Sequence, residues 1–338
     1  MIRLGKWAEK RPLFTGVDRP VIAGISGGAT SAMMAALTST DALLCFQNTG
    51  KEDNATYVFL EQLEEHLGRK IVWLEYRPPA QKGAPPCESR WAEVTSRTAD
   101  RAGAPFEMLL AALKEYRATK GKGPIAPWAR SRLCTTYLKT RVARRYVSDH
   151  KWERWDELVG LRADEPARVE KLRSGVSANI GRRAPLSEAN VTKADVHMFW
   201  SQQDFQLQLP SYRGNCTGCF LKDQADLSRS LDENGDAAWW TKLSVEYPGF
   251  GGRRFAGYAQ LHREAPVRRE IEQALREGHS VKKPTWLDER RFALVVIQER
   301  KRLAGEVQPF SCACEGAEAL ANMDDVEENE VILSLPET

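Results

Sequence analysis

The hydrophobic and polar positions of the chain form short apolar runs separated by segments with a helical period. The apolar runs predict four buried strands, at Val21–Ile25, Ala42–Phe46, Ile71–Tyr76 and Glu157–Leu161. The helical segments lie at Ser31–Leu37, Asn54–Leu67, 106–116, 137–150 and 193–202. Because strands that alternate with helices pair in parallel, the pattern predicts an α/β fold with a doubly wound, mostly parallel sheet.

Helix-end signals and a change of pattern divide the chain further. For the segment Asn54–Leu67, Asp53 or Asn54 can cap the start and Gly68 the end. Beyond about residue 225 the pattern is helical and rich in Trp, with a strand signal only around Phe292–Ile297. We therefore expect an α/β domain over 1–225, a mainly helical extension over 226–310, and a terminal segment over 311–338.

Composition limits the classes of protein that fit. Hydrophobic residues make up 42% of the 338 residues, which is enough to bury a sizeable core. No apolar run approaches the ~20 residues of a membrane-spanning helix, and the first residues lack the apolar core of a signal peptide. We expect a soluble, cytoplasmic protein with no membrane partner.

Charge is unevenly distributed, although the net charge of +3 does not by itself require a nucleic-acid partner. The segment 129–146 has no acidic residue and six basic ones: Arg130, Arg132, Lys139, Arg141, Arg144 and Arg145. The tail from Glu315 has eight acidic residues and no basic one. The basic segment is either a solvated helix face or an anion site, with a nucleic acid as one candidate partner.

A glycine loop follows the first predicted strand. Ser26-Gly27-Gly28 ends the apolar run, and Thr30 and Ser31 open the next helix. Free backbone N–H groups and the helix dipole favour an anion at such a helix start, and hydroxyl groups can donate to phosphate or sulfate oxygens. The loop lacks the Walker A and GxGxxG patterns, and loops of this kind are as often tight turns as ligand sites.

The second predicted strand also ends in polar residues, which are Asn48, Thr49, Gly50, Lys51 and Glu52. In open parallel sheets, ligands bind outside the carboxyl ends of the strands. The two loops, SGGATS and NTGKE, are therefore expected to border one crevice.

Several stretches in order resemble the phosphoadenosine phosphosulfate (PAPS) reductase family of the PP-loop, adenine-nucleotide alpha-hydrolase-like group. These are SGGATS, NTGKE, IVWLEY, RLCTTYLK at 132–139, GLRADEPAR at 160–168, PL at 185–186 and GNCTGCFLK at 214–222. The resemblance covers roughly residues 20–225 and then CAC at 312–314. It implies the PP-loop fold and an adenine nucleotide, PAPS or ATP, as ligand.

The resemblance also implies roles for particular residues. The PP-loop residues that would hold phosphate or sulfate oxygens are Ser26, Gly27, Gly28, Thr30 and Ser31. The adjoining wall would be Asn48, Thr49, Gly50, Lys51 and Glu52, and Gly160 to Arg168 would form the opposite rim. Lys51 and Arg162 are the candidate catalytic cations.

Chemistry alone adds detail at this rim. Arg162 and Arg168 are plausible bidentate clamps for an anion, and Asp164 and Glu165 could bind Mg²⁺ or a ribose hydroxyl; the alternative is a surface charge network. ATP-cleaving relatives usually have Asp at the position of Thr30. Its absence here favours sulfonucleotide chemistry over ATP-driven adenylation.

The cysteines leave three alternatives open. In the first, Cys134, Cys216, Cys219 and either Cys312 or Cys314 hold a 4Fe–4S cluster. In the second, Cys216, Cys219, Cys312 and Cys314 hold zinc, and Cys134 stays beside the nucleotide. In the third there is no metal, and Cys312 or Cys314 is a catalytic nucleophile, as the resemblance implies for a tail cysteine.

Three functions follow from these alternatives. The first is a sulfonucleotide-reductase-like enzyme of sulfur transfer or reduction, which would need a thioredoxin-type reductant or a sulfur donor as partner. The second is an ATP-dependent sulfurtransferase that thiolates DNA or tRNA, with the segment 129–146 contacting the nucleic acid. The third is a nucleotide-binding module without catalysis.

Overall fold

The computed structural model describes residues 2–305, apart from 11, 15–17, 40, 129–130, 176, 211 and 253–254. The chain forms two compact units. One comprises Met1–Ile125 and Ser131–Leu209 and is called the sheet unit, and the other comprises Ala126–Arg130 and Pro210–Ser311 and is called the helical unit. The predicted three-part division stays a prediction, since residues 311–338 lie outside the described part of the chain.

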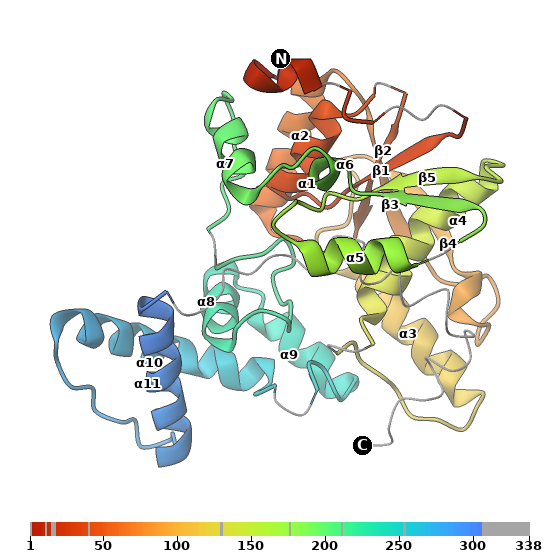
Figure 1. The fold of residues 1–338 in the computed structure, drawn as a ribbon. Helices are drawn as coiled ribbons and strands as arrows, with labels where there is room; N and C mark the ends of the chain where they lie inside the picture. Colours follow the sequence, from red (N-terminus) through yellow and green to blue (C-terminus); the bar gives the residue numbers. More distant parts are fainter. Residues whose placement is uncertain are drawn as a thin grey trace. The chain divides into compact units, whose positions relative to one another are not determined.

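The sheet unit is an α/β structure, as predicted (Figure 1). Its described strands are β1 (Val21–Ile25), β2 (Leu43–Asn48), β3 (Ile71–Arg77), β4 (Arg90–Val94), β5 (Trp155–Leu158) and β6 (Ile180–Arg183). They form one sheet in the order β4-β3-β2-β1-β5-β6, in which every pair is parallel except β3 with β4. The strand order reverses beside β1, since β2 lies on one side of it and β5 on the other.

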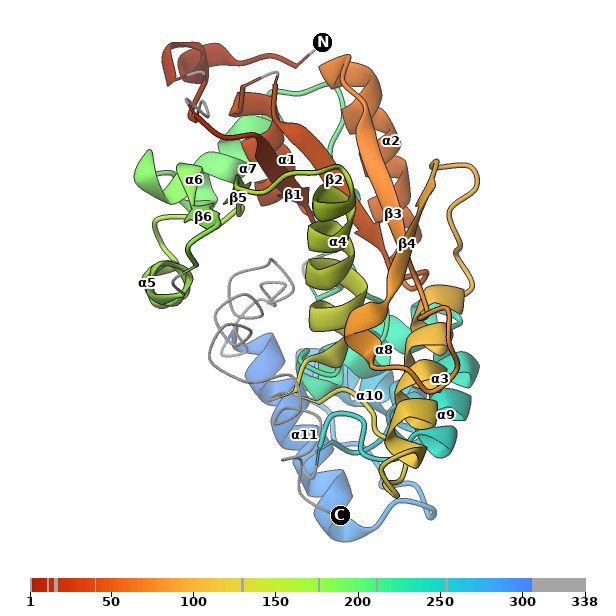
Figure 2. The ribbon, with the colours of Figure 1, turned by 90° about the vertical axis from the view of Figure 1, so that its right-hand side faces the viewer.

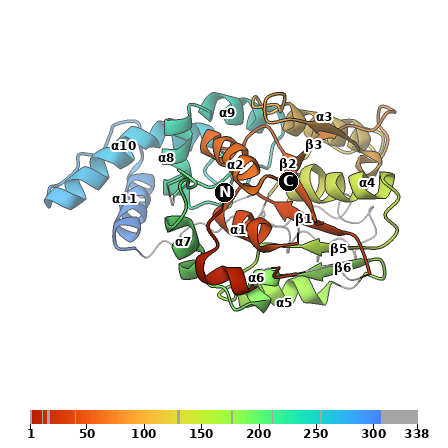
Figure 3. The same cartoon turned by 90° about the horizontal axis from the view of Figure 1, so that it is seen from above.

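Helices cover both faces of the sheet, which explains the continuous apolar runs of β1 to β3. The described helices of this unit are η1 (Gly5–Lys10), α1 (Ala29–Leu37), α2 (Asn54–Leu67), η2 (Pro86–Glu88), α3 (Ala104–Ala118), η3 (Cys134–Thr140), α4 (Arg141–Asp149), α5 (Pro166–Ser174), α6 (Pro185–Glu188) and α7 (Lys193–Ser201). Figures 2 and 3 show α1 and α2 on one face of the sheet and α4 on the other.

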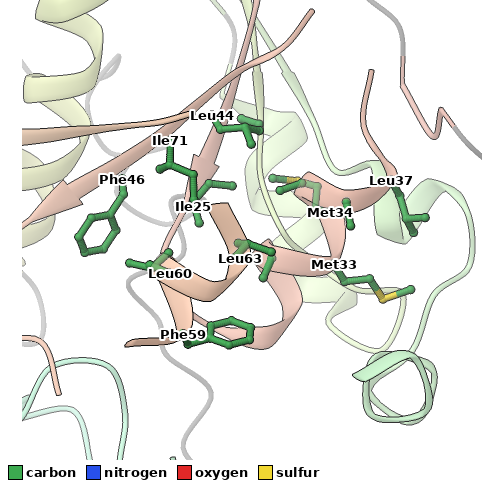
Figure 4. Packing of buried hydrophobic residues seen from close by; sticks show 14 of the residues in the cluster. Ile25, Met33, Met34, Leu37, Leu44, Phe46, Phe59, Leu60, Leu63 and Ile71 are labelled. Carbon is green, nitrogen blue, oxygen red and sulfur yellow. The ribbon is translucent and has the colours of Figure 1, made fainter. Parts of the chain in front are cut away.

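The main core lies between the sheet and the helices α1 and α2 (Figure 4). The labelled side chains come from the strands (Ile25, Leu44, Phe46, Ile71), from α1 (Met33, Met34, Leu37) and from α2 (Phe59, Leu60, Leu63). Each of them is at most 1% exposed. Burial of one such side chain contributes about 1.5–3 kcal/mol, so this layer fixes the positions of the two helices relative to the strands.

The caps of α2 confirm the sequence-based prediction. Asp53 accepts a hydrogen bond from the backbone N–H of Ala55 (3.0 Å), and Gly68 ends the helix in the left-handed conformation (φ 60°). Positive φ strains residues with a Cβ, which explains the glycine.

The helical unit contains four described helices: α8 (Gln224–Asn234), α9 (Ala237–Glu246), α10 (Tyr258–Glu277) and α11 (Glu289–Leu303). The strand signal around Phe292–Ile297 was wrong, because these residues lie inside α11. Asp288 caps that helix by accepting from Arg291 N–H (2.8 Å), and Val295 is buried against α10 residues such as Ile271. Within this apolar run only Val295 is buried, whereas Leu294 and Ile297 are 41% and 48% exposed.

Three strands, β4, β5 and β6, differ from the prediction. The strand expected at Glu157–Leu161 is β5, which begins at Trp155 and ends at Leu158. β4 and β6 were not predicted, because both lie at sheet edges and carry charged residues that interrupt the apolar pattern.

In the described part of the chain, no helix has the length and apolar character needed to cross a bilayer.

Candidate functional site

The glycine loop turns directly from β1 into α1. Ser26 N–H donates to Ser31 Oγ (3.1 Å), the two hydroxyl oxygens lie 2.9 Å apart, and Ser31 Oγ donates to the Gly28 carbonyl (3.1 Å). Gly27 has φ +82°, and a Cβ there would lie 2.3 Å from Thr56 Cγ2, so only glycine fits. Gly28 occupies the N-cap of α1 without a side-chain cap, which leaves the cap position to backbone or ligand.

A cavity of about 90 Å³ lies against β1 and β5 beside this loop. Its apolar lining includes Ile22, Ile25, Leu158 and Val159, and its polar lining includes Ser26, Ser31, Gln47, Thr135, Lys139, Thr140 and Glu157. β1 is the strand at which the order of the sheet reverses, and such reversal points are where open α/β sheets bind ligands. The cavity therefore lies at the position that the topology favours for a ligand.

Residues after β5 reach the start of α1. A Cβ on Gly160 would lie 3.0 Å from Ser31 Cα, so the two backbones approach closely here. Arg162 Nη1 donates to Thr30 Oγ1 (3.3 Å), and its Nε donates to Asp164 Oδ1 (2.9 Å). The structure thus brings the predicted rim and the predicted PP-loop together.

The acidic residues of the rim bind its arginines. Glu165 pairs with Arg162 (3.3 Å) and with Arg168, and it accepts a hydrogen bond from Arg162 N–H (3.2 Å). The second oxygen of Asp164 accepts from Lys193 N–H (3.2 Å). Because both carboxylates already accept N–H groups, they hold the guanidinium groups in place beside the loop.

The NTGKE residues form a buried polar network. Glu52 accepts from Thr49 Oγ1 (2.7 Å), Thr49 N–H (3.1 Å) and Tyr57 OH (3.2 Å), and Tyr57 OH also donates to Asn48 Oδ1 (2.9 Å). Burial, together with the Glu52 carboxylate, raises the pKa of Tyr57 far above its usual value. Lys51 is buried as well, at 4% exposure. This network fixes the end of β2 and so positions the cavity wall at Gln47.

The segment η3 supplies three cavity residues, of which the sequence analysis named Lys139 in the basic segment but missed Thr135 and Thr140. Cys134–Thr140 is a π-helical turn that continues into α4, and Thr135, Lys139 and Thr140 line the cavity. Lys139 Nζ lies 4.0 Å from Glu52 Oε1, with its side chain only 14% exposed. A π turn is a frequent feature of functional sites, but it shifts side chains away from the faces that an α-helical period predicts.

The basic segment is partly occupied by internal ion pairs. Arg144 makes two bonds to Glu157, from Nε (2.9 Å) and Nη2 (3.1 Å), and both side chains are largely buried. Arg145 pairs with Asp149 at the surface (3.1 Å). Arg130 lies outside the described residues. An anion contact by Arg144 would require its pair with Glu157 to break.

The candidate sulfur ligands fall in different parts of the chain. Cys134 begins η3 in the sheet unit, whereas Cys216 and Cys219 belong to the helical unit. Cys312 and Cys314 lie outside the described residues. Over the described part of the chain, no three His, Cys, Asp or Glu side chains are grouped as metal ligands would be. Cys216 and Cys219 are the candidate ligands that share one loop of the described chain.

The loop that carries this pair is firmly packed. A Cβ on Gly218 would lie 2.1 Å from the ring of Trp240, and the Gly218 carbonyl accepts from Tyr258 OH (2.8 Å). Lys222, 4% exposed, donates from Nζ to the Cys216 carbonyl (2.9 Å) and to the Thr217 carbonyl (3.3 Å). The CxxC loop is thus held by side chains of the helical unit.

Comparison with known proteins finds similarity to a phage protein. No protein-family model matches the chain. The chain is 27% identical over 225 residues to the uncharacterized nin region protein ORF290 of Escherichia phage lambda, a match that covers 63% of this chain and 70% of that protein. Because that protein is uncharacterized, the similarity carries no activity to this chain.

Proposed function

We propose that the protein is a PAPS-reductase-family enzyme of the PP-loop group that binds an adenine sulfonucleotide and acts in sulfur transfer or reduction. The observation that carries the proposal is the convergence of Arg162 and Gly160 on the first turn of α1, beside a cavity that Lys139 lines. Three positively charged features therefore lie near one end of β1: the N-terminus of α1, Arg162 and Lys139.

These features suit a phosphate or sulfate group. Arg162 offers planar N–H donors near the Thr30 hydroxyl, and Lys139 offers a compact charge from the opposite helix layer. Ser26 and Ser31 supply hydroxyl groups at the loop itself. An anion between them would gain charge-assisted hydrogen bonds, which are stronger than bonds between neutral groups.

The apolar part of the cavity supports an organic group attached to that anion. Ile22, Leu158 and Val159 form walls that a nucleobase or ribose carbon can contact. Thr30 replaces the carboxylate that metal-assisted ATP cleavage would use, and Asp164 and Glu165 are engaged with arginines. Both facts favour a sulfonucleotide over ATP with Mg²⁺.

A second candidate is the ATP-dependent sulfurtransferase that thiolates a nucleic acid. It is favoured by two features of the helical unit, which the next subsection describes: an exposed Trp, and two cations that form no ion pair within the described part of the chain. In either reaction the sulfur chemistry would need a thiol or cluster. The candidates are the pair Cys216 and Cys219, with Cys134 and the two cysteines outside the described residues.

The test is nucleotide binding by calorimetry with PAPS, ATP and GTP. Gly28→Asp should abolish binding, because it places a carboxylate where the anion must sit. Gly28 has φ −92° and ψ 158°, an ordinary N-cap conformation in which Asp is itself a good cap, so the variant should fold. Gly28→Asn is the matched neutral control. Equal affinity of Gly28→Asp and wild type for PAPS and ATP would remove the proposal.

A further inference from the structure

The helical unit contains a second hollow, of about 570 Å³, which shares no lining residue with the cavity of the sheet unit. One wall is a face of α10, formed by Arg263, Pro266, Val267 and Glu270, whose spacing places them on the same side of a helix. The other wall is the loop 282–286, which ends in Trp286. Its volume is in the range of sites that bind organic ligands.

The loop wall is anchored on both sides. Leu287 is 2% exposed and packs with Val267, Ile271 and Val295, and Val281 packs against the same cluster. Lys283 Nζ donates to the Leu287 carbonyl (2.9 Å). The hollow therefore has a fixed shape and needs no folding of the loop on binding.

Two cations of the hollow lack an anionic partner. Among the described residues, Arg263 and Lys282 form no ion pair, although most other arginines of α10 and α11 do. Arg263 instead lies over the ring of Trp286, with its guanidinium carbon 4.7 Å from the ring centroid. Trp286 is 41% exposed, an unusual exposure for a large aromatic residue in a hollow.

We propose that this hollow binds a single-stranded segment of nucleic acid, with a base stacked at Trp286 and phosphates at Arg263 and Lys282. Proteins that hold single strands combine these two elements, aromatic stacking platforms and a positive groove. A carboxylate-rich peptide would use the cations but gain nothing from the indole. The inference rests on the second candidate function, for which it names the binding surface.

The test is fluorescence anisotropy of a labelled oligothymidylate with the full chain at low salt. Trp286→Ala should lower the affinity at least about fivefold, because base stacking is lost, while Trp286→Phe should retain most of it. Lys282→Gln should reduce the salt slope of binding by about 0.7, the value for one single-strand phosphate contact.

Lys301→Gln is the matched control, since Lys301 is an exposed lysine of the same unit that does not line the hollow. It should bind the oligonucleotide as wild type does. Absence of binding at low salt, equal affinity of Trp286→Ala and wild type, or equally strong competition by polyglutamate would each overturn the inference.

The same samples separate this inference from the nucleotide proposal. Gly28→Asp should still bind oligothymidylate, and Trp286→Ala should still bind PAPS or ATP. If the wild-type protein binds PAPS or ATP but no oligothymidylate, only the proposed nucleic-acid surface on the helical unit is refuted. If it binds oligothymidylate but neither nucleotide, only the proposed nucleotide site in the sheet unit is refuted.

Discussion

Lys139 combines burial with a carboxylate partner that is itself immobile. Its ammonium lies 4.0 Å from Glu52, and Glu52 is held by Thr49 and Tyr57. The conformational entropy of the lysine side chain is thus already lost in the folded protein. A cation ordered in this way gives a ligand its charge with little further ordering on binding.

Lys139→Met should therefore weaken binding of the nucleotide about 10- to 100-fold, because a charge-assisted hydrogen bond contributes about 1.5–3 kcal/mol. Calorimetry with PAPS and ATP measures this loss, and thermal melting reports on the fold. Lys70→Met is the control, since Lys70 makes an exposed pair with Glu93. Unchanged affinity of Lys139→Met would contradict a role for this lysine in the site.

Asp226 on α8 makes the stability of the helical unit depend on pH. It is 5% exposed, and burial, reinforced by the Asp223 carboxylate, raises its pKa to about 6. Between roughly pH 4 and pH 6 the folded state holds a proton that the unfolded state has released, so this group's contribution to the free energy of unfolding falls as pH rises.

Asp226→Asn removes that charge, so it should raise the free energy of unfolding at pH 7 by about 3 kcal/mol. It should also remove the corresponding fall in stability between pH 4 and pH 6. Urea unfolding at several pH values measures both effects. Asp232→Asn, on the same helix but in a surface pair with Arg269, serves as control. Parallel pH profiles for Asp226→Asn and wild type would refute the assignment.

At the scale of elements, a buried ionic network joins α10 to α11. Arg268, 4% exposed, pairs with Glu264 (2.9 Å) on its own helix and with Glu299 (3.0 Å) on α11. Arg291 of α11 forms a second ion pair with Glu264. An apolar cluster that includes Ile271 and Val295 also lies between the two helices, so the network and the cluster together hold the pair.

Arg268→Met should lower the free energy of unfolding by about 1.5–3 kcal/mol, because charged hydrogen bonds to Glu264 and Glu299 are lost while these carboxylates keep Arg291 and Arg302 as partners. The neighbouring Arg269→Met should cost less than about 1 kcal/mol, since its pair with Asp232 lies at the surface. Urea titration of both variants provides the comparison. Similar losses for the two arginines would mean that the buried network contributes little.

At the scale of the whole molecule, the sequence predicts well those strands and helices whose positions follow from the period of their hydrophobic residues. The strands β1 to β3 and the capped helix α2 follow directly from burial and end signals. The π turn that directs Lys139 into the cavity, and the pairing of Arg144 with Glu157, depend on tertiary contacts that no local pattern encodes. The short apolar run in α11 has no period long enough to distinguish strand from helix.

The distribution of cysteines over both units leads to the last prediction. The CxxC loop is packed against Trp240 and held by Lys222, and its spacing lets both thiols bind one metal centre, so a cluster would need two more sulfur ligands. The remaining candidates are Cys134, Cys312 and Cys314.

We therefore expect brown protein after anaerobic purification, with about four irons and four labile sulfides per chain. Cys216→Ser should lose the colour. Cys312→Ser and Cys314→Ser should differ from each other in colour and iron content if only one of the two cysteines is a ligand. Cys45→Ser should keep it, because Cys45 is buried in β2, where burial raises the pKa of its thiol to about 12. Colourless protein with about one zinc per chain would instead assign the cysteines to a zinc site. Such a site has no sulfide to transfer, so the sulfur atom of the reaction would then have to come from a cysteine or from a separate donor.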